Sequence, residues 1–126
     1  MTHFDHLEQY IPNLRTLSIL DIGSGLGGFF IDATGKGATV TGIEISDEYI
    51  AKTQELLKRK GSDAEVVKGV GENIPFNSAS FDFVNLCEVI EHVEDPEEVL
   101  TEVLRVLNSN GMAYMSLPNH FVIKKN

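Results

Sequence analysis

An apolar run that ends in a glycine-rich loop constrains the fold of this chain more than any other feature. Residues 19–29 read ILDIGSGLGGF, and a second apolar run ends at Glu44. A chain that turns sharply from a strand into a helix needs positive φ angles or close backbone approach, and glycine allows both at little cost. Glu44 follows Gly25 by about 20 positions, the spacing at which an acidic residue binds the hydroxyl groups of a ribose. The sequence therefore predicts the first half of a nucleoside-binding α/β sheet.

The loop glycines and Glu44 have distinct expected roles. We expect Gly23 and Gly25 to form the turn. Gly27 and Gly28 would let the next helix pack close to the sheet, and the N–H groups at the start of that helix could contact an anionic group of a ligand. A carboxylate only accepts hydrogen bonds, so Glu44 could take both hydroxyl protons of an unphosphorylated ribose. A buried, unpaired carboxylate at this position would be costly, and a ribose partner would remove that cost.

Strand-like and helix-like segments alternate along the rest of the chain. Strands are expected at about 17–22, 38–44, 65–69, 81–87 and 111–117, and helices at about 4–11, 27–34, 47–60 and 96–107. Ser46 or Asp47 can cap the third of these helices, and Asp95 followed by Pro96 is a strong start for the fourth. This alternation predicts an α/β fold, a Rossmann-like parallel sheet with helices on both faces.

Composition and charge exclude several classes of protein. The chain has 126 residues, so we expect one domain that covers 1–126. Its net charge of −9 would repel a polyphosphate backbone, which argues against nucleic acid as a partner. No apolar stretch approaches the roughly 20 residues that span a bilayer, and no signal peptide is recognisable, so we expect a cytoplasmic protein with no membrane partner. Cys87 is the single cysteine and the histidines have no ligand spacing, so we expect no disulfide and no structural metal.

The glycine spacing alone leaves two kinds of nucleotide site open. Gly23, Gly25 and Gly28 also match the G-x-G-x-x-G pattern of NAD-binding domains. Nicotinamide domains usually carry an apolar residue two positions before the first glycine, and this chain has Asp21 there. Asp21 therefore favours a different site, and an NAD-dependent oxidoreductase remains an alternative.

Several sequence blocks carry a resemblance to a known family. They are LDIGSGLG (20–27), VTGIEIS (40–46), GVGENIPF (69–76) and FDFVNLCEVIEHVEDPEEVL (81–100), followed by LRVLNSNGMAYMSLPN (104–119). In this order they resemble the class I S-adenosylmethionine-dependent methyltransferases. CEVIEHV at 87–93 is most similar to the ubiquinone-biosynthesis O-methyltransferase and related "type 11" groups. The resemblance implies a sheet ordered 3-2-1-4-5, continued in the complete core by two further strands, one antiparallel, that this chain would lack.

Without later strands, the fifth strand would be an exposed outer edge of the sheet. Residues 112–117 place apolar side chains on both faces, a pattern that suits a buried strand better than an edge. An exposed edge strand is a template for pairing with another chain. We therefore expect either a fragment of a longer protein or a homodimer formed through the fifth strand.

The resemblance also implies roles for individual residues. Asp21 would face the amino group of the methionine part of S-adenosylmethionine, partly through water. Val70 stands where relatives often carry an aspartate that meets the adenine amino group, so backbone groups near Gly71 and Glu72 would recognise adenine. The cofactor-binding residues expected on this basis are Asp21, Gly23, Ser24, Gly25, Gly27, Glu44, Ile45, Gly71, Glu72, Leu86, Cys87 and Glu88.

The end of the fourth strand is where the resemblance places the transferred methyl group. Leu86, Cys87 and Glu88 would lie at the mouth that faces it, with Cys87 as a small lining residue rather than a nucleophile. His92 is either the general base for a hydroxyl acceptor or part of a helix start packed under the strand.

The activity implied by the resemblance is methyl transfer from S-adenosylmethionine to an oxygen, nitrogen or carbon of a small molecule, with S-adenosylhomocysteine as the product. The sulfonium charge disappears during this in-line displacement, so positioning would supply most of the rate. A second alternative is a non-catalytic module or subunit that binds S-adenosylmethionine.

Overall fold

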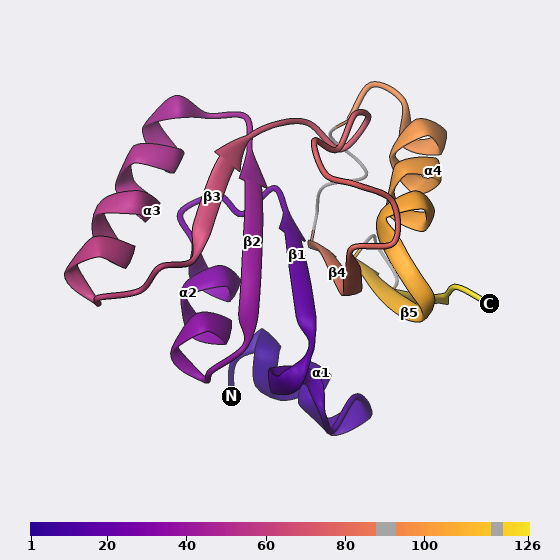
Figure 1. The fold of residues 1–126 in the computed structure, drawn as a ribbon, viewed down its shortest axis with the longest axis horizontal. Coiled ribbons are helices and arrows are strands. Elements are labelled where there is room, and N and C mark those ends of the chain that lie inside the picture. Colours follow the sequence, from indigo (N-terminus) through magenta and orange to yellow (C-terminus); the bar gives the residue numbers. More distant parts are fainter. Residues whose placement is uncertain (88–92, 117–119) are drawn as a thin grey trace.

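A six-stranded sheet forms the centre of the computed structural model, which describes residues 1–87, 93–116 and 120–126 (Figure 1). The strands are β1 (Ser18–Ile22), β2 (Thr39–Glu44), β3 (Glu65–Lys68), β4 (Phe81–Cys87), β5 (Leu107–Ser116) and β6 (His120–Lys124). Their order is β3-β2-β1-β4-β5-β6, and the predicted order of the first five is confirmed. These five are parallel, whereas β6 is antiparallel to β5. The strand order reverses between β1 and β4, where open α/β sheets bind ligands at the carboxyl ends of their strands.

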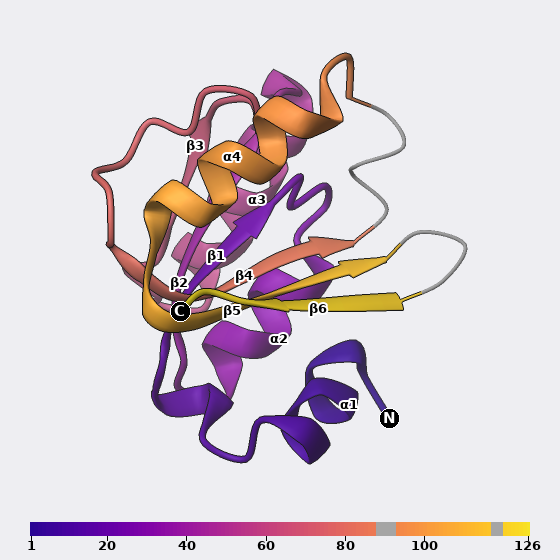
Figure 2. The ribbon, with the colours of Figure 1, turned by 90° about the vertical axis from the view of Figure 1, so that its right-hand side faces the viewer.

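Helices cover both faces of the sheet, as the alternation predicted. They are α1 (His3–Tyr10), α2 (Gly28–Gly35), α3 (Asp47–Arg59) and α4 (Pro96–Val106), and a short 3-10 turn, Leu14–Thr16, precedes β1. Figure 2 shows α4 on one side of the sheet and α1 and α2 on the other. Ser46 caps α3 by accepting from the N–H of Tyr49, and Asp95 caps α4 by accepting from the N–H of Glu98. Within the described parts of the chain, no helix combines the length and the apolar character needed to cross a membrane.

Successive side chains of each strand point to opposite faces of the sheet, so the hydrophobic core has two layers, one on each face. Ile19 and Phe83 are fully buried and pack with Phe30 of α2 on the face that α1 also covers. Their neighbours Leu20 and Val84 are fully buried on the opposite face, under α4. Successive residues of a strand point to opposite faces, so strands buried on both sides are apolar throughout.

Helix α1 is attached to the rest of the domain by apolar and ionic contacts. Phe4 and Leu7 are buried against the sheet. The ammonium group of Lys36, at the end of α2, lies 2.7 Å from the carboxylate of Asp5 and 3.0 Å from that of Asp32. These contacts hold the first turn of α1 over the sheet and against α2.

Strand β6 corrects the expectation about the outer edge of the sheet. Five residue pairs join β6 to β5, from Met112 with Lys124 to Ser116 with His120. The expected open edge on the fifth strand, and with it a homodimer formed by pairing there, is therefore wrong. Residues 120–124 contain only three consecutive apolar residues and no strand-like alternation. They form a strand because the edge of β5 offers unpaired N–H and C=O groups that need partners.

Candidate functional site

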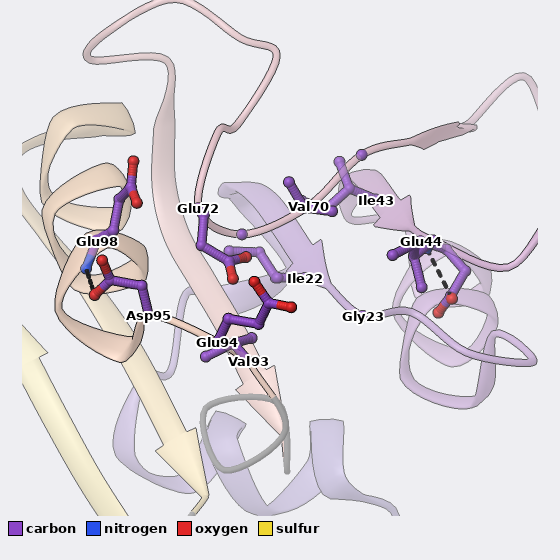
Figure 3. Close-up of a pocket in the computed structure, with 13 residues that line it drawn as sticks. Ile22, Gly23, Ile43, Glu44, Val70, Glu72, Val93, Glu94, Asp95 and Glu98 are labelled. Atoms are coloured by element: carbon purple, nitrogen blue, oxygen red, sulfur yellow. Dashed lines mark hydrogen bonds between the residues drawn. The ribbon is translucent and has the colours of Figure 1, made fainter.

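A pocket of about 860 Å³ opens at the carboxyl ends of β1, β2 and β3 (Figure 3). Its walls come from the ends of these strands and the loops that follow them, from residues 93–95 before α4, and from Glu98 in the first turn of α4. Small-molecule sites in proteins typically measure about 300–1,000 Å³. The pocket therefore has a suitable size and lies in the crevice that the strand order predicts as a ligand site.

The structure brings together about half of the residues expected to bind a cofactor. The candidates that line the pocket are Gly23, Glu44, Ile45, Gly71 and Glu72. Asp21 and Ser24 are buried next to it rather than in its wall. Leu86 is fully buried in the core under α4.

Three other candidates cannot be placed at the pocket. Glu88 and His92 lie outside the residues that the structure describes, and so does the side chain of Cys87. Their expected roles beside the transferred methyl group stay predictions.

Glu44, at the end of β2, has its carboxylate bonded by backbone N–H groups. One oxygen, Oε1, accepts from Gly25 at 2.8 Å. The other, Oε2, accepts from Ile45 and Ser46, each at 2.8 Å. The expectation that Glu44 would be unpaired without a ribose is therefore wrong, because three N–H groups compensate for its burial. A carboxylate offers about four lone-pair positions, so the observed bonds leave about one for a ligand.

Four N–H groups of the glycine loop, those of Gly23, Ser24, Gly25 and Gly27, are bonded within the protein. Gly23 and Ser24 both donate to the carbonyl oxygen of Ile43, at 2.9 and 3.1 Å. Gly27 donates to the carbonyl oxygen of Ser24 at 2.9 Å, and Gly25 donates to the carboxylate at the end of β2. An anionic ligand at these four groups would have to displace existing bonds.

The glycines before α2 differ in how closely they approach other atoms. Every glycine in the turn between β1 and α2 has a positive φ, which confirms the expected turn. A Cβ on Gly27 would lie 3.1 Å from Ile31 of α2 and 3.3 Å from Thr53 of α3, so this glycine allows close approach to those helices rather than the expected packing against the sheet. A Cβ on Gly28 would meet nothing within 4 Å. The expectation of close packing is therefore wrong for Gly28.

Asp21 is a buried carboxyl group beside the pocket. It is 3% exposed, and its Oδ1 accepts a 3.0 Å hydrogen bond from Nδ2 of Asn85 on β4. Burial raises the pKa of Asp21 from its ordinary value of 3.8 to about 7; the bond from Asn85 opposes this rise and the nearby charge of Glu44 adds to it. A cationic ligand group near Asp21 would stabilise its ionised form.

Sequence reasoning missed Asn85 and its second partner. The amide Oδ1 of Asn85 lies 3.0 Å from Nε2 of His3, the first residue of α1. Parallel register was the signal that could have revealed the bond to Asp21, because Asp21 and Asn85 are paired residues of β1 and β4. An amide in the middle of an apolar strand also needs a buried hydrogen-bond partner.

Glu102 and Arg105 of α4, which sequence reasoning also missed, hold a loop of the pocket. The guanidinium of Arg105 donates to the carbonyl oxygens of Ile74 and Phe76, both at 2.9 Å, and to the carboxylate of Glu102. That carboxylate accepts from the N–H of Ile74 at 2.8 Å, and the bond from Arg105 lowers the pKa of Glu102. The pair therefore fixes one end of segment 69–76, which lines the pocket.

The pocket is strongly acidic. Its carboxylates belong to Glu44, Glu72, Glu94, Asp95 and Glu98, and no lysine, arginine or histidine is among its described lining residues. Such a pocket attracts a cationic ligand and repels a polyanionic one. No group of three or more His, Cys, Asp or Glu side chains suited to a metal ion occurs in the part of the chain that the structure describes.

Comparisons with known sequences give one family. Residues 20–115 match the family described as "Methyltransferase domain". A norajmaline N-methyltransferase from Rauvolfia serpentina is 35% identical over 98 residues, which cover 75% of this chain and 34% of that protein. A ubiquinone biosynthesis O-methyltransferase from Paracidovorax citrulli is 36% identical over 112 residues, which cover 84% of this chain and 45% of that protein. The chain therefore spans less than half the length of these relatives.

Solved structures share the fold. The PH0226 protein from Pyrococcus horikoshii OT3 has a TM-score of 0.80 and 31% identity, and the match covers 89% of this chain and 53% of that one. A putative sarcosine dimethylglycine methyltransferase from Galdieria sulphuraria has a TM-score of 0.82 at 23% identity, a likeness of fold alone that covers 89% of this chain and 43% of that one. With a family match over residues 20–115, the chain belongs to the class I S-adenosylmethionine-dependent methyltransferases.

Proposed function

We propose that this domain binds S-adenosylmethionine in the pocket at the carboxyl ends of β1 to β3 and transfers its methyl group to a small molecule. The acidic lining of the pocket carries this proposal. The cofactor has a sulfonium and an ammonium group against a single carboxylate, so it is a net cation that an acidic pocket attracts. The pocket volume of about 860 Å³ also suits a nucleoside with an amino-acid tail.

The residues present fit this cofactor at several points. Glu44 has about one lone-pair position left for a ribose hydroxyl. Asp21 is a buried carboxyl group suited to the ammonium group, and the nearby Ser24 hydroxyl is buried without a hydrogen-bond partner. Ile45 is 64% and Val70 39% exposed, so both offer apolar surface for the adenine ring. Backbone groups near Gly71 and Glu72 would complete adenine recognition.

The same charges disfavour the NAD alternative. A dinucleotide would bring a pyrophosphate toward a wall with Glu44 and Glu72. Charges of equal sign a few ångströms apart repel by roughly 1–4 kcal/mol for water-like to surface-like surroundings. Four N–H groups of the glycine loop, which would otherwise offset this repulsion, are already bonded within the protein.

The transfer itself would depend on positioning. When bound, the cofactor supplies an activated methyl group, and the sulfonium charge disappears as the methyl moves to the acceptor. The chain then needs to hold the acceptor in line and exclude water, with a base only where the acceptor keeps its proton. The two relatives named above are an N- and an O-methyltransferase, so the acceptor atom is left open in this proposal.

Calorimetric titration tests the cofactor proposal. We expect S-adenosylmethionine and S-adenosylhomocysteine to bind to the protein and NAD⁺ not to bind. Glu44→Ala should weaken binding by about 1.5–3 kcal/mol, because it removes a charged acceptor and releases the glycine loop. Glu48→Ala is the matched control, since Glu48 is exposed on α3 and forms a surface ion pair with Lys52. Binding of NAD⁺ without binding of S-adenosylmethionine would refute the proposal.

A transfer assay separates the enzyme from a binding module. Protein incubated with methyl-labelled S-adenosylmethionine and a panel of phenols, amines and quinols should yield a labelled small molecule and S-adenosylhomocysteine. Tight cofactor binding without transfer to any member of the panel would favour the non-catalytic alternative.

A further inference from the structure

A row of side chains crosses the sheet beneath α1, close to the pocket. Asp21 of β1 pairs in register with Asn85 of β4, and Asn85 pairs with Tyr114 of β5. Paired residues of neighbouring strands point to the same face, so the three side chains share the face that α1 and α2 cover. His3 of α1 lies over this row, with its ring centroid 4.9 Å from that of Tyr114 and 5.4 Å from that of Phe29. The imidazole ring is therefore held between two aromatic rings.

Both the nitrogen and the oxygen of the Asn85 amide form hydrogen bonds. Asn85 is fully buried; its Nδ2 donates to Asp21 and its Oδ1 lies 3.0 Å from Nε2 of His3. An amide oxygen only accepts hydrogen bonds, so with Nδ2 facing Asp21 the proton of the second bond must be on Nε2 of His3. The contact from α1 thereby sets which way the amide faces, and the amide presents its N–H group to Asp21.

We propose that Asn85, oriented by His3, is a positioning residue that holds the Asp21 carboxylate for the cationic group of the cofactor. This inference rests on the function proposed above. A carboxylate buried beside an anionic neighbour, here Glu44 of β2, needs a donor to remain ionised before the ligand arrives. Asn85 supplies that donor from β4, and α1 contributes through the contact of His3 with Asn85. Among the residues that the structure describes, the titratable groups that face Asp21 or its partner include Glu44, His3 and, beside His3, Tyr114.

The first test measures the affinity for S-adenosylhomocysteine between about pH 6 and pH 9. For the wild-type protein, affinity should rise with pH as Asp21 ionises and then level off. Asn85→Leu keeps the size of the side chain and removes the donor, so at pH 7 binding should be roughly tenfold weaker and the midpoint of the rise should move to higher pH. A purely structural role would weaken binding equally at every pH.

Asn108→Leu is the matched control for this substitution. Asn108 also donates its amide N–H to an aspartate of β4, Asp82, at 2.8 Å. Asp82 is at the start of β4, at the opposite end of the strand from the pocket. Asn108→Leu should therefore leave the pH midpoint of binding unchanged, whatever it does to stability.

The second test concerns His3. His3→Ala removes the partner of the Asn85 oxygen and should move the binding profile in the same direction as Asn85→Leu. His3→Gln retains an N–H group near the position of Nε2 and should restore the wild-type midpoint. His6→Ala changes an exposed histidine of the same helix and should have no effect on the profile.

The outcomes separate the two proposals. If the wild-type protein binds the nucleoside but Asn85→Leu leaves the midpoint unchanged, the positioning role is wrong and the proposed function stands. If the wild-type protein binds neither S-adenosylmethionine nor S-adenosylhomocysteine at any pH, the proposed function fails, and the role of Asn85 in cofactor binding fails with it. A shifted midpoint in Asn85→Leu and His3→Ala, together with rescue by His3→Gln, supports both.

Discussion

At the level of single residues, the site contains two buried carboxyl groups, Glu44 and Asp21. The burial of Glu44 is compatible with a stable fold, whereas Asp21 lowers the stability of the fold when it is ionised. Glu44 is buried but accepts three backbone hydrogen bonds, so its burial is compensated. Asp21 is buried with one hydrogen bond, from Asn85, and its pKa is raised to about 7. A buried carboxyl group with a raised pKa costs stability when it ionises, which is typical of residues kept for ligand binding.

Asp21→Asn should stabilise the protein in a pH-dependent way. In the unfolded chain Asp21 loses its proton near 3.8, whereas in the native state it does so near 7. Between these values the native state holds the extra proton, so the free energy of unfolding falls as pH rises and stays low above pH 7. Asp21→Asn removes this loss, and Tm at about pH 8 should rise by a few degrees while Tm at about pH 4 changes little.

Thermal unfolding at both pH values checks this prediction. Asp63→Asn, at an exposed position, is the control and should leave the pH dependence unchanged. Lower stability of Asp21→Asn at both pH values would show that the ionised carboxylate stabilises the fold.

Gly27→Ala and Gly28→Ala should differ although the two residues are adjacent. Gly27 has φ +87°, and a Cβ there would lie 3.1 Å from Ile31, so alanine should cost about 2 kcal/mol or more of unfolding free energy. Gly28 begins α2 and has open space around its Cβ position, so alanine there should be neutral or stabilise by up to about 1 kcal/mol. Urea unfolding measures both changes, and equal losses would contradict the geometry of the turn.

At the scale of elements, α4 supports the pocket although it contributes little of its wall. Arg105 and Glu102 project from the last turns of α4 and bind the backbone of Ile74 and Phe76. Segment 69–76 has little regular structure of its own, so these side-chain bonds replace the ladder that a strand would provide.

Arg105→Ala should loosen this segment. It removes one donor from each of two backbone carbonyl groups, of which that of Ile74 keeps the N–H of Phe76, and this should lower the free energy of unfolding by about 1–3 kcal/mol and weaken cofactor binding. Arg59→Ala is the control, because Arg59 forms an exposed pair with Glu55 on α3 that is worth about 0–1 kcal/mol. Hydrogen exchange at the Ile74 amide should accelerate in Arg105→Ala alone. Unchanged exchange there would show that other contacts hold the segment.

At the scale of the whole molecule, β6 determines how the sheet ends. It covers β5, and two backbone hydrogen bonds extend this pairing beyond the end of β6: the N–H of Asn110 donates to the carbonyl oxygen of Lys125, and the N–H of Lys125 donates to that of Gly111, both at 2.8 Å. Phe121 and Val122 are 45% and 61% exposed on β6. Charged residues at an edge strand oppose pairing with another chain, and β6 ends in lysines.

Removal of residues 120–126 should cause self-association. The deletion uncovers the N–H and C=O groups of β5, whose side chains are apolar on both faces, so sedimentation should show mass that rises with concentration. The 126-residue chain without this deletion should sediment as a monomer over the same range. Val122→Lys is the control, because it reduces exposed apolar surface but keeps the backbone pairing of β6 with β5. If the deletion variant and Val122→Lys associate to the same extent, the uncovered strand edge is not the cause of association.

Local or regularly spaced residues were enough to predict part of this protein from its sequence. The glycine turn, the caps Ser46 and Asp95, and the alternation of strands and helices follow from backbone sterics, capping chemistry and hydrophobic period, whereas the order of the first five strands was predicted only through the family resemblance. Glu44 was placed at the pocket by its distance from the glycine loop. These features need few long-range contacts, so a single sequence suffices to predict them.

Tertiary structure alone decided how the polar groups of the site are paired. The backbone bonds of Glu44, the contact from His3 through Asn85, and the hold of Arg105 on the segment before β4 join residues up to 82 positions apart. Such partners are chosen by strand register and helix placement, which no local pattern contains. Strand β6 belongs to the same class, because a weak strand sequence became a strand only where an unpaired edge was available to it.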